Sequence, residues 1–202
     1  MRVLEKMVPS SYEYFGPEQH DADMKNIVAN TADAVRIIGQ VKGQWDGELD
    51  DVVATAHKIL NFEREDHSDY LYIADLSDRT PTLRRIAEVI GFTDNVQTRI
   101  QMQRPGCTHS RHRDPAGLYI NPYRVQVLVA LAPWEYGQCL FFNDTVVDKW
   151  QVGDVIYSEF HNVDHFTTNA SWHTRPLLHI IGEPGESLQQ LLAAKEKHIF
   201  QL

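Results

Sequence analysis

The hydrophobic period of the chain changes near residue 96, and this change constrains the fold more than any other feature. From there to residue 182, apolar and polar residues alternate in short runs: VQTRIQMQ, RVQVLVAL, QCLFFN, DVIYS and PLLHIIG. Pro, Gly, Asn and Asp separate the runs, which is typical of strands joined by turns. Several short strands at this spacing predict a sandwich or a barrel.

The chain before residue 96 shows mostly the 3.6-residue period of helices. Residues 46–60 carry an apolar stripe behind a capping Asp, and a weaker stripe occupies residues 24–28. Residues 80–91 begin with Thr-Pro and end with Gly, which predicts a helix with defined ends. Between these helices, YLYIADL at 70–76 is predicted to be a strand.

We therefore expect one domain over residues 1–202 of the chain. Residues 1–95 would form a helical support region, residues 96–182 the β core, and residues 183–202 a C-terminal helix. The expected fold class is α+β, mainly β, with the helices against one face of the β core.

Composition excludes some classes of function. The 28 acidic residues outnumber the 19 Lys and Arg residues, and a formal charge of −9 disfavours nonspecific binding to nucleic acid. The N-terminus has no apolar run behind its basic residues, and no stretch approaches the length of a membrane span. Cys107 and Cys139 fit neither a disulfide framework nor a metal clip. We expect a soluble, cytoplasmic protein with reduced thiols.

The segment THSRHRDPAGLYIN contains the triplet His112-Arg113-Asp114. A protein-kinase catalytic loop would need Asn five residues after the Asp, but Tyr119 occupies that position. On a strand, His112 and Asp114 would point to the same face, where they would form half of a metal site.

A second segment, GDVIYSEFHNVDHFTTNASWHTRPLLHIIG, supplies the rest of a possible site. It contains His165, and Arg175 follows ten residues later. A third ligand on another strand would complete a two-histidine, one-carboxylate triad, which suits Fe(II) and leaves positions open. An arginine nearby could bind the far carboxylate of a chelating diacid through two hydrogen bonds.

On these motifs the chain resembles the 2-oxoglutarate and Fe(II)-dependent oxygenases, which have a double-stranded β-helix (jelly-roll, cupin-like) fold. The resemblance covers roughly residues 96–182. IQMQRPG resembles the opening strand, HRD the H-x-D motif, and HFTTNASWHTRPLLHI the distal H-x-x-x-N-x-S-x-x-x-R segment.

The resemblance implies that His112, Asp114 and His165 bind Fe(II), and that Arg175 binds the C5 carboxylate of 2-oxoglutarate. It also implies O2 as cosubstrate and hydroxylation of a C–H bond with release of succinate and CO2. Many members have Ser two residues after the arginine, where this chain has Leu177. Another hydroxyl must replace it, and the candidates are Tyr119, Tyr123 and Thr167.

The other histidines have less specific interpretations. His161 is the rival distal ligand, but it lacks the Asn and Ser that follow His165. His109 and His173 are expected at the surface or behind the ligands, and His179 in the core.

The alternative function is a cupin-like barrel that holds Zn or Mn without oxygenase activity; such a barrel would have no need of Arg175. The substrate stays open among small molecules, amino acids and peptides, with nucleic acid disfavoured, and the oligomeric state is open too.

Overall fold

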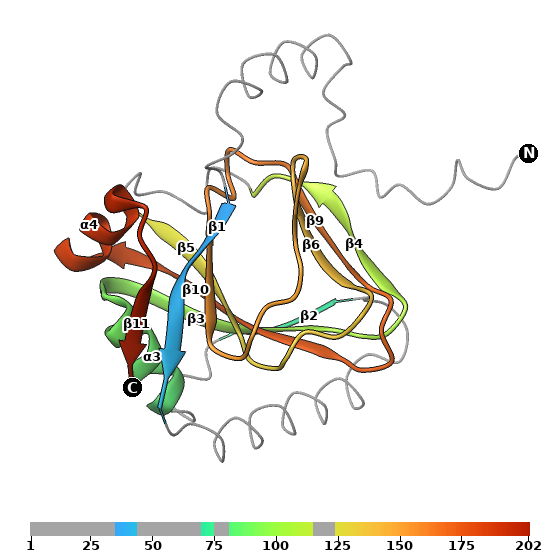
Figure 1. Cartoon of the computed structure of the whole chain (residues 1–202), viewed down its shortest axis with the longest axis horizontal. Coiled ribbons are helices and arrows are strands. Elements are labelled where there is room, and N and C mark those ends of the chain that lie inside the picture. Colours follow the sequence, from blue (N-terminus) through green and yellow to red (C-terminus); the bar gives the residue numbers. More distant parts are fainter. Residues whose placement is uncertain (1–34, 44–69, 75–80, 115–123) are drawn as a thin grey trace, which may run out of the picture. The chain divides into compact units, whose positions relative to one another are not determined.

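The computed structural model describes residues 35–43, 70–74, 81–114 and 124–202 of the chain. Within these ranges it forms two β-sheets and two helices (Figure 1). The larger sheet has seven strands in the order β11-β1-β8-β5-β10-β3-β2. Its strands are β1 (Val35–Lys42), β2 (Tyr70–Ala74), β3 (Phe92–Gln103), β5 (Val125–Ala130), β8 (Asp154–Ser158), β10 (Arg175–Pro184) and β11 (His198–Gln201).

The smaller sheet has four strands in the order β4-β9-β6-β7. These are β4 (Cys107–His112), β6 (Gln138–Phe142), β7 (Thr145–Val147) and β9 (His165–Asn169). All of its pairs are antiparallel. Among the described residues no strand pairing joins the two sheets, so the predicted mainly β core of jelly-roll type is present as two sheets that do not close into a barrel.

The larger sheet is buried on both faces, as β5 illustrates. Val127 and Val129 belong to a core that also contains residues of the two helices, α3 (Pro81–Ile90) and α4 (Glu186–Ala194). Leu128 and Ala130, which point the other way, belong to a second core with Leu140 and Phe142 of the smaller sheet. The described chain is therefore layered as helices, larger sheet and smaller sheet.

Helix α3 matches its prediction, with Leu83, Ile86 and Ile90 all buried and Gly91 following the last helical residue at φ +105°. The C-terminal segment is only partly as expected. Helix α4 ends at Ala194, and residues 198–201 form strand β11, parallel to β1. Phe200 on β11 is buried in the helix-side core, which explains why a segment with a helical pattern ends as a strand.

Within the first 95 residues, the described part of the chain contains strands β1 and β2 besides helix α3 and the start of β3. Strand β1 was not predicted, because residues 35–42 lie between two helical stripes, while β2 confirms the predicted strand. The helices expected at residues 24–28 and 46–60 lie outside the described residues. None of the described helices has the length and apolar character needed to span a membrane.

Candidate metal centre

A β-bulge in β4 aims two histidines into the space between the sheets. In the antiparallel pair of β4 and β9, His109 is opposite Thr167 and His112 is opposite His165. Two residues of β4 therefore face only Phe166 on β9, which is the pattern of a bulge. The extra residue reverses the alternation, so His109 and His112 both line the pocket although they are three residues apart.

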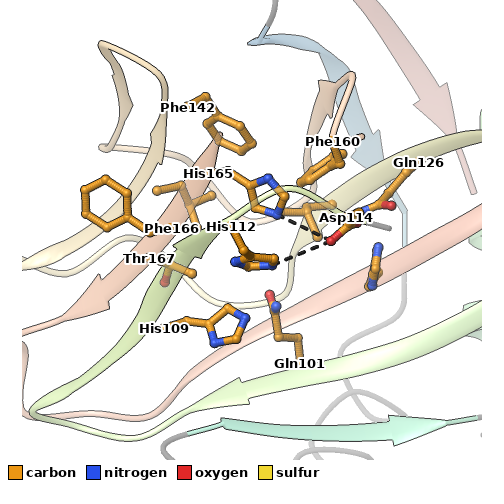
Figure 2. A pocket seen from close by; sticks show the side chains of 13 residues that line it. Gln101, His109, His112, Asp114, Gln126, Phe142, Phe160, His165, Phe166 and Thr167 are labelled. Carbon is orange, nitrogen blue, oxygen red and sulfur yellow. Dashed lines mark ion pairs between the residues drawn. The ribbon is translucent and has the colours of Figure 1, made fainter. Parts of the chain in front are cut away.

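The two sequence segments meet at this pocket. One ligand atom from each of His112, Asp114 and His165 lies within 4.8 Å of the others. Both Nε2 atoms are 3.6 Å from the same oxygen, Oδ1 of Asp114, as the dashed lines in Figure 2 show. His112 is the last residue of β4 and Asp114 lies just beyond the strand, where its backbone N–H donates to the Phe160 carbonyl (3.1 Å). The pocket at these atoms has a volume of about 20 Å³, which is enough for an ion or one water.

Backbone hydrogen bonds orient both imidazoles. Nδ1 of His112 lies 2.7 Å from the Ser110 carbonyl, and Nδ1 of His165 lies 3.0 Å from the Val163 carbonyl. A carbonyl only accepts hydrogen bonds, so each Nδ1 carries the proton and donates it. In the neutral ring the Nε2 lone pair is then directed at the pocket, which is the tautomer that a metal ion requires.

The charges at the triad favour an ionised carboxylate. Burial alone would raise the pKa of Asp114, but hydrogen bonds from His112 and His165 hold it far below its usual value. Burial would lower the pKa of His112, yet the hydrogen bond with Asp114 leaves it raised. Such a hydrogen bond needs a proton on Nε2, and a ring that already donates from Nδ1 has one there only as an imidazolium; a bound metal ion would take the place of that proton.

The remaining pocket wall is polar on one side and aromatic on the other. Gln101, Gln126 and His179 contribute buried polar side chains from the larger sheet. Phe142 and Phe160 pack against His165, with ring centroids 6.1 and 5.1 Å away. In Figure 2 the aromatic rings lie on the His165 side, and Gln101 lies on the His112 side.

The other histidines divide into pocket and surface residues. His109 lies edge-on to His112 at 4.4 Å, and burial lowers its pKa to about 4. Burial likewise lowers the pKa of His179 to about 4, so the expected core histidine is buried but also lines the pocket. His161 is exposed and outside the triad, and His173 is exposed beside Glu135 (2.8 Å).

Arg175 opens strand β10 and is 1% exposed. Its Nη2 donates to Thr167 Oγ1 at 2.6 Å, and Thr167 lines the same pocket as the triad. Trp150 covers the guanidinium, with its ring centroid 6.0 Å from the guanidinium carbon. Arg175 is therefore a buried cation whose hydrogen-bond partner, Thr167, lines the pocket.

The Thr167 hydroxyl has a defined role in this arrangement. It donates to Gln103 Oε1 at 2.7 Å while it accepts from Arg175. Since a hydroxyl has a single proton, Thr167 orients the guanidinium and has no second proton for a ligand. Of the other hydroxyl candidates, Tyr119 and Tyr123 lie outside the described residues.

Residues that the motif reasoning missed are mostly glutamines and asparagines. Gln103 is fully buried, and its amide donates to the carbonyls of Cys107 (3.1 Å) and Thr167 (3.2 Å). Asn169 donates to the Gln103 carbonyl (2.8 Å) and thereby joins β9 to β3. The available signal was the spacing of Gln101 and Gln103 in a strand whose alternate residues are apolar.

An ion-pair cluster lies beside the triad. Asp164 Oδ1 accepts from Arg113 Nε at 2.5 Å, and Oδ2 accepts from Arg111 Nε at 3.1 Å. Burial alone would raise the pKa of Asp164, but the two arginines, Arg113 foremost, hold it below its usual value. We refer to Arg111, Arg113 and Asp164 as the Asp164 cluster.

Comparison with known proteins gives matches of structure only. No protein-family model and no curated protein match the sequence. The α-ketoglutarate-dependent non-haem carbocyclase SnoK of nogalamycin biosynthesis matches with a TM-score of 0.54 and 16% identity, over 83% of this chain and 89% of that one. The α-ketoglutarate-dependent epimerase SnoN of the same biosynthesis matches with a TM-score of 0.53 and 13% identity, over 81% of this chain and 84% of that one.

HygX of Streptomyces hygroscopicus, solved with nickel and 2-oxoglutarate, matches at a TM-score of 0.51 and 15% identity, over 85% of this chain and 88% of that one. Identities this low establish a shared fold and leave the chemistry to the residues of this chain. The chain has the fold of the 2-oxoglutarate and Fe(II)-dependent non-haem oxygenase superfamily.

Proposed function

We propose that the protein is a 2-oxoglutarate-dependent Fe(II) dioxygenase that hydroxylates a C–H bond of a small molecule, amino acid or peptide, with release of succinate and CO2. The observation that carries the proposal is the convergence of two imidazole Nε2 atoms on one carboxylate oxygen, each 3.6 Å from Asp114 Oδ1.

His112, Asp114 and His165 fit Fe(II) by their chemistry. Two neutral nitrogen donors and one carboxylate form the facial set of non-haem iron oxygenases, which leaves coordination positions for other ligands. Hydrogen bonds already fix both imidazoles in the required tautomer. When bound, iron and 2-oxoglutarate would supply the oxidising chemistry, while the chain orients them and limits the access of water.

Arg175 fits the distal carboxylate of 2-oxoglutarate. It lies on the same face of β10 as the pocket residue His179, four residues earlier, which is a strand distance of about 13 Å. A five-carbon diacid that chelates the metal could cover this separation together with the long arginine side chain. The guanidinium would bind both carboxylate oxygens, and Thr167 and Trp150 would hold it in place.

Two structural neighbours have been solved with a metal ion and 2-oxoglutarate, and the neighbours differ in their reactions. HygX holds nickel and 2-oxoglutarate, and SnoN has been solved with Fe3+ and α-ketoglutarate. One neighbour is an epimerase and another is a carbocyclase. Because the reactions differ within one fold, they do not identify the reaction or the substrate of this chain. We propose hydroxylation and no halogenation, because Asp114 would fill the coordination position that chloride would otherwise take.

An anaerobic titration tests the proposal. Addition of Fe(II) and then 2-oxoglutarate to the metal-free protein should produce the visible charge-transfer band of the chelate. Succinate release across a panel of metabolites and peptides would then identify the substrate. A protein that binds Zn or Mn but gives no band and no 2-oxoglutarate binding would instead be the cupin-like barrel.

A further inference from the structure

We propose that Asp164 is a positioning residue of the metal centre, which fixes the H-x-D segment against the distal histidine by binding the two arginines that flank His112. This inference rests on the proposed metal site. Its basis is the order of the residues: Arg111 and Arg113 alternate with His112 and Asp114, and Asp164 directly precedes His165. Each of the three ligands therefore has a member of the Asp164 cluster as its neighbour in the chain.

The alternation separates the ligands from the Asp164 cluster. The bulge in β4 directs His112 into the pocket, so its neighbour Arg111 points to the opposite side. There Arg111 and Arg113 each bind a different oxygen of the Asp164 carboxylate, at 3.1 and 2.5 Å between Nε and oxygen. One carboxylate thus links two points of the H-x-D segment to the start of β9.

The backbone of Asp164 is itself held in place by a third segment. Asn143, in the turn between β6 and β7, donates its backbone N–H to the Asp164 carbonyl at 2.7 Å. The Asp164 backbone N–H donates to Asn143 Oδ1 at 3.2 Å. The side chain of Asp164 is only 11% exposed, whereas those of Arg111 and Arg113 are 48% and 32% exposed. Asp164 is therefore the most buried residue of the Asp164 cluster, and the two arginines connect the H-x-D segment to it.

A purely electrostatic role makes a different prediction. If the three charges acted only through their field on a bound cation, removal of Asp164 would weaken metal binding, and removal of either arginine would strengthen it. If they position the ligands, removal of any member weakens metal binding. The arginine variants therefore distinguish the two roles by the sign of the effect.

The experiment measures Co(II) affinity, because Co(II) is a stable substitute whose visible spectrum reports its coordination. The variants are Asp164→Asn, Asp164→Glu, Arg111→Gln and Arg113→Gln. Outer residues that orient metal ligands typically change affinity by roughly 10- to 100-fold. We expect a loss in this range for Asp164→Asn and Arg113→Gln, a smaller loss for the more exposed Arg111, partial recovery with Glu, and altered Co(II) bands.

Matched controls come from the exposed pair Arg84 and Glu88 on α3, whose side chains are 71% and 62% exposed. Glu88→Gln and Arg84→Gln change the net charge by the same amounts and should leave Co(II) affinity unchanged. Circular dichroism establishes that each variant is folded. If Asp164→Asn does not fold, the two arginine variants decide the question, because their side chains lie nearer the surface.

Two results would overturn the proposal: wild-type Co(II) affinity in folded Asp164→Asn, or equal or tighter binding in Arg113→Gln. Failure of the proposed function has a separate signature. A wild-type protein that binds Co(II) but not 2-oxoglutarate refutes the oxygenase and still allows the variants to be compared. A wild-type protein that binds no Co(II) refutes both.

Discussion

At the scale of single residues, two backbone carbonyls select the chemistry of the site. The carbonyls of Ser110 and Val163 accept hydrogen bonds from Nδ1 of His112 and His165. The lone pair on Nε2 of each neutral ring is then available to bind a metal ion. This selection occurs before any metal ion arrives, and it lowers the cost of organising the ligands.

We predict that alanine at His112, Asp114 or His165 abolishes iron binding and turnover. Each would supply one of three protein bonds to the metal, and none belongs to the two apolar cores, so the fold should persist. Calorimetric Fe(II) titration and circular dichroism measure the two properties. The control is His161→Ala, which removes an exposed imidazole; loss of iron binding in that variant would show that the distal ligand was wrongly chosen.

Arg175→Ala should weaken 2-oxoglutarate binding by roughly 10- to 100-fold. A hydrogen bond to a charged group contributes about 1.5 to 3 kcal/mol, and about 1.4 kcal/mol corresponds to a factor of ten. Arg175→Lys keeps the charge but cannot bind both carboxylate oxygens in the same way, so its affinity for 2-oxoglutarate should lie between those of the wild-type protein and Arg175→Ala. The measurement is a 2-oxoglutarate titration at saturating Fe(II). Equal affinity in all three proteins would remove Arg175 as the anchor and favour the cupin-like alternative.

At the scale of elements, the position of β11 depends on a glycine in β1. A Cβ atom on Gly39 would lie 2.2 Å from the His198 carbonyl oxygen and 2.7 Å from the Phe200 ring, both on β11. No side-chain rotation can relieve the contact with the backbone oxygen. Gly39 is therefore what permits the C-terminal strand to pair with β1.

Gly39→Ala should destabilise the protein by about 1 to 3 kcal/mol, the usual cost of overpacking. The expected result is a lower midpoint of chemical denaturation, together with faster amide exchange in residues 198–201. In a chain truncated after residue 197 the same substitution should have little further effect, because the atoms that it meets are gone. An undiminished effect in the truncated chain would locate the strain elsewhere in β1.

At the scale of the whole described molecule, the larger sheet separates an apolar core from a functional one. Its helix-side face packs mainly against apolar residues, with Thr98 as a buried polar exception, and its other face carries Arg175, His179, Gln101 and Gln126 among apolar neighbours. Apolar burial therefore occurs on both faces of this sheet, and the polar groups of the site are buried on the face toward the smaller sheet.

Buried His179 should make the metal-free protein sensitive to acid. Its pKa is lowered to about 4, against roughly 6.5 in an unfolded chain. Between these values the unfolded state binds the proton and the native state does not, so the free energy of unfolding falls as the pH falls. The contribution of neutral His179 to the free energy of unfolding is complete above pH 6.5 and is lost toward pH 4. The loss is on the order of 3 kcal/mol.

Denaturation of the metal-free protein at several pH values measures this loss. His179→Leu should flatten the decline between pH 6.5 and pH 4, whereas substitution of exposed His161 by Leu should leave it unchanged. An identical decline in His179→Leu and the wild-type protein would assign the acid sensitivity to other groups.

Elements with a local hydrophobic pattern could be predicted from the amino-acid order alone. Alternation after residue 96 predicted β3, β5, β6, β8 and β10, and the Thr-Pro start and Gly stop predicted α3. The spacing of His112, Asp114, His165 and Arg175 also indicated a site before any contact was known, because the ligands lie in two short segments with recognisable order.

Features that depend on contacts between distant segments could not be predicted in this way. Strand β1 pairs with β8, and β11 pairs with β1 across more than 150 residues, so neither could be predicted from its own period. The open arrangement of two sheets and the bulge in β4 depend on pairing register, which a single strand does not encode. The same holds for Gln103, Asp164 and His179: their polar side chains are ordinary in sequence, and burial beside particular partners gives them their roles.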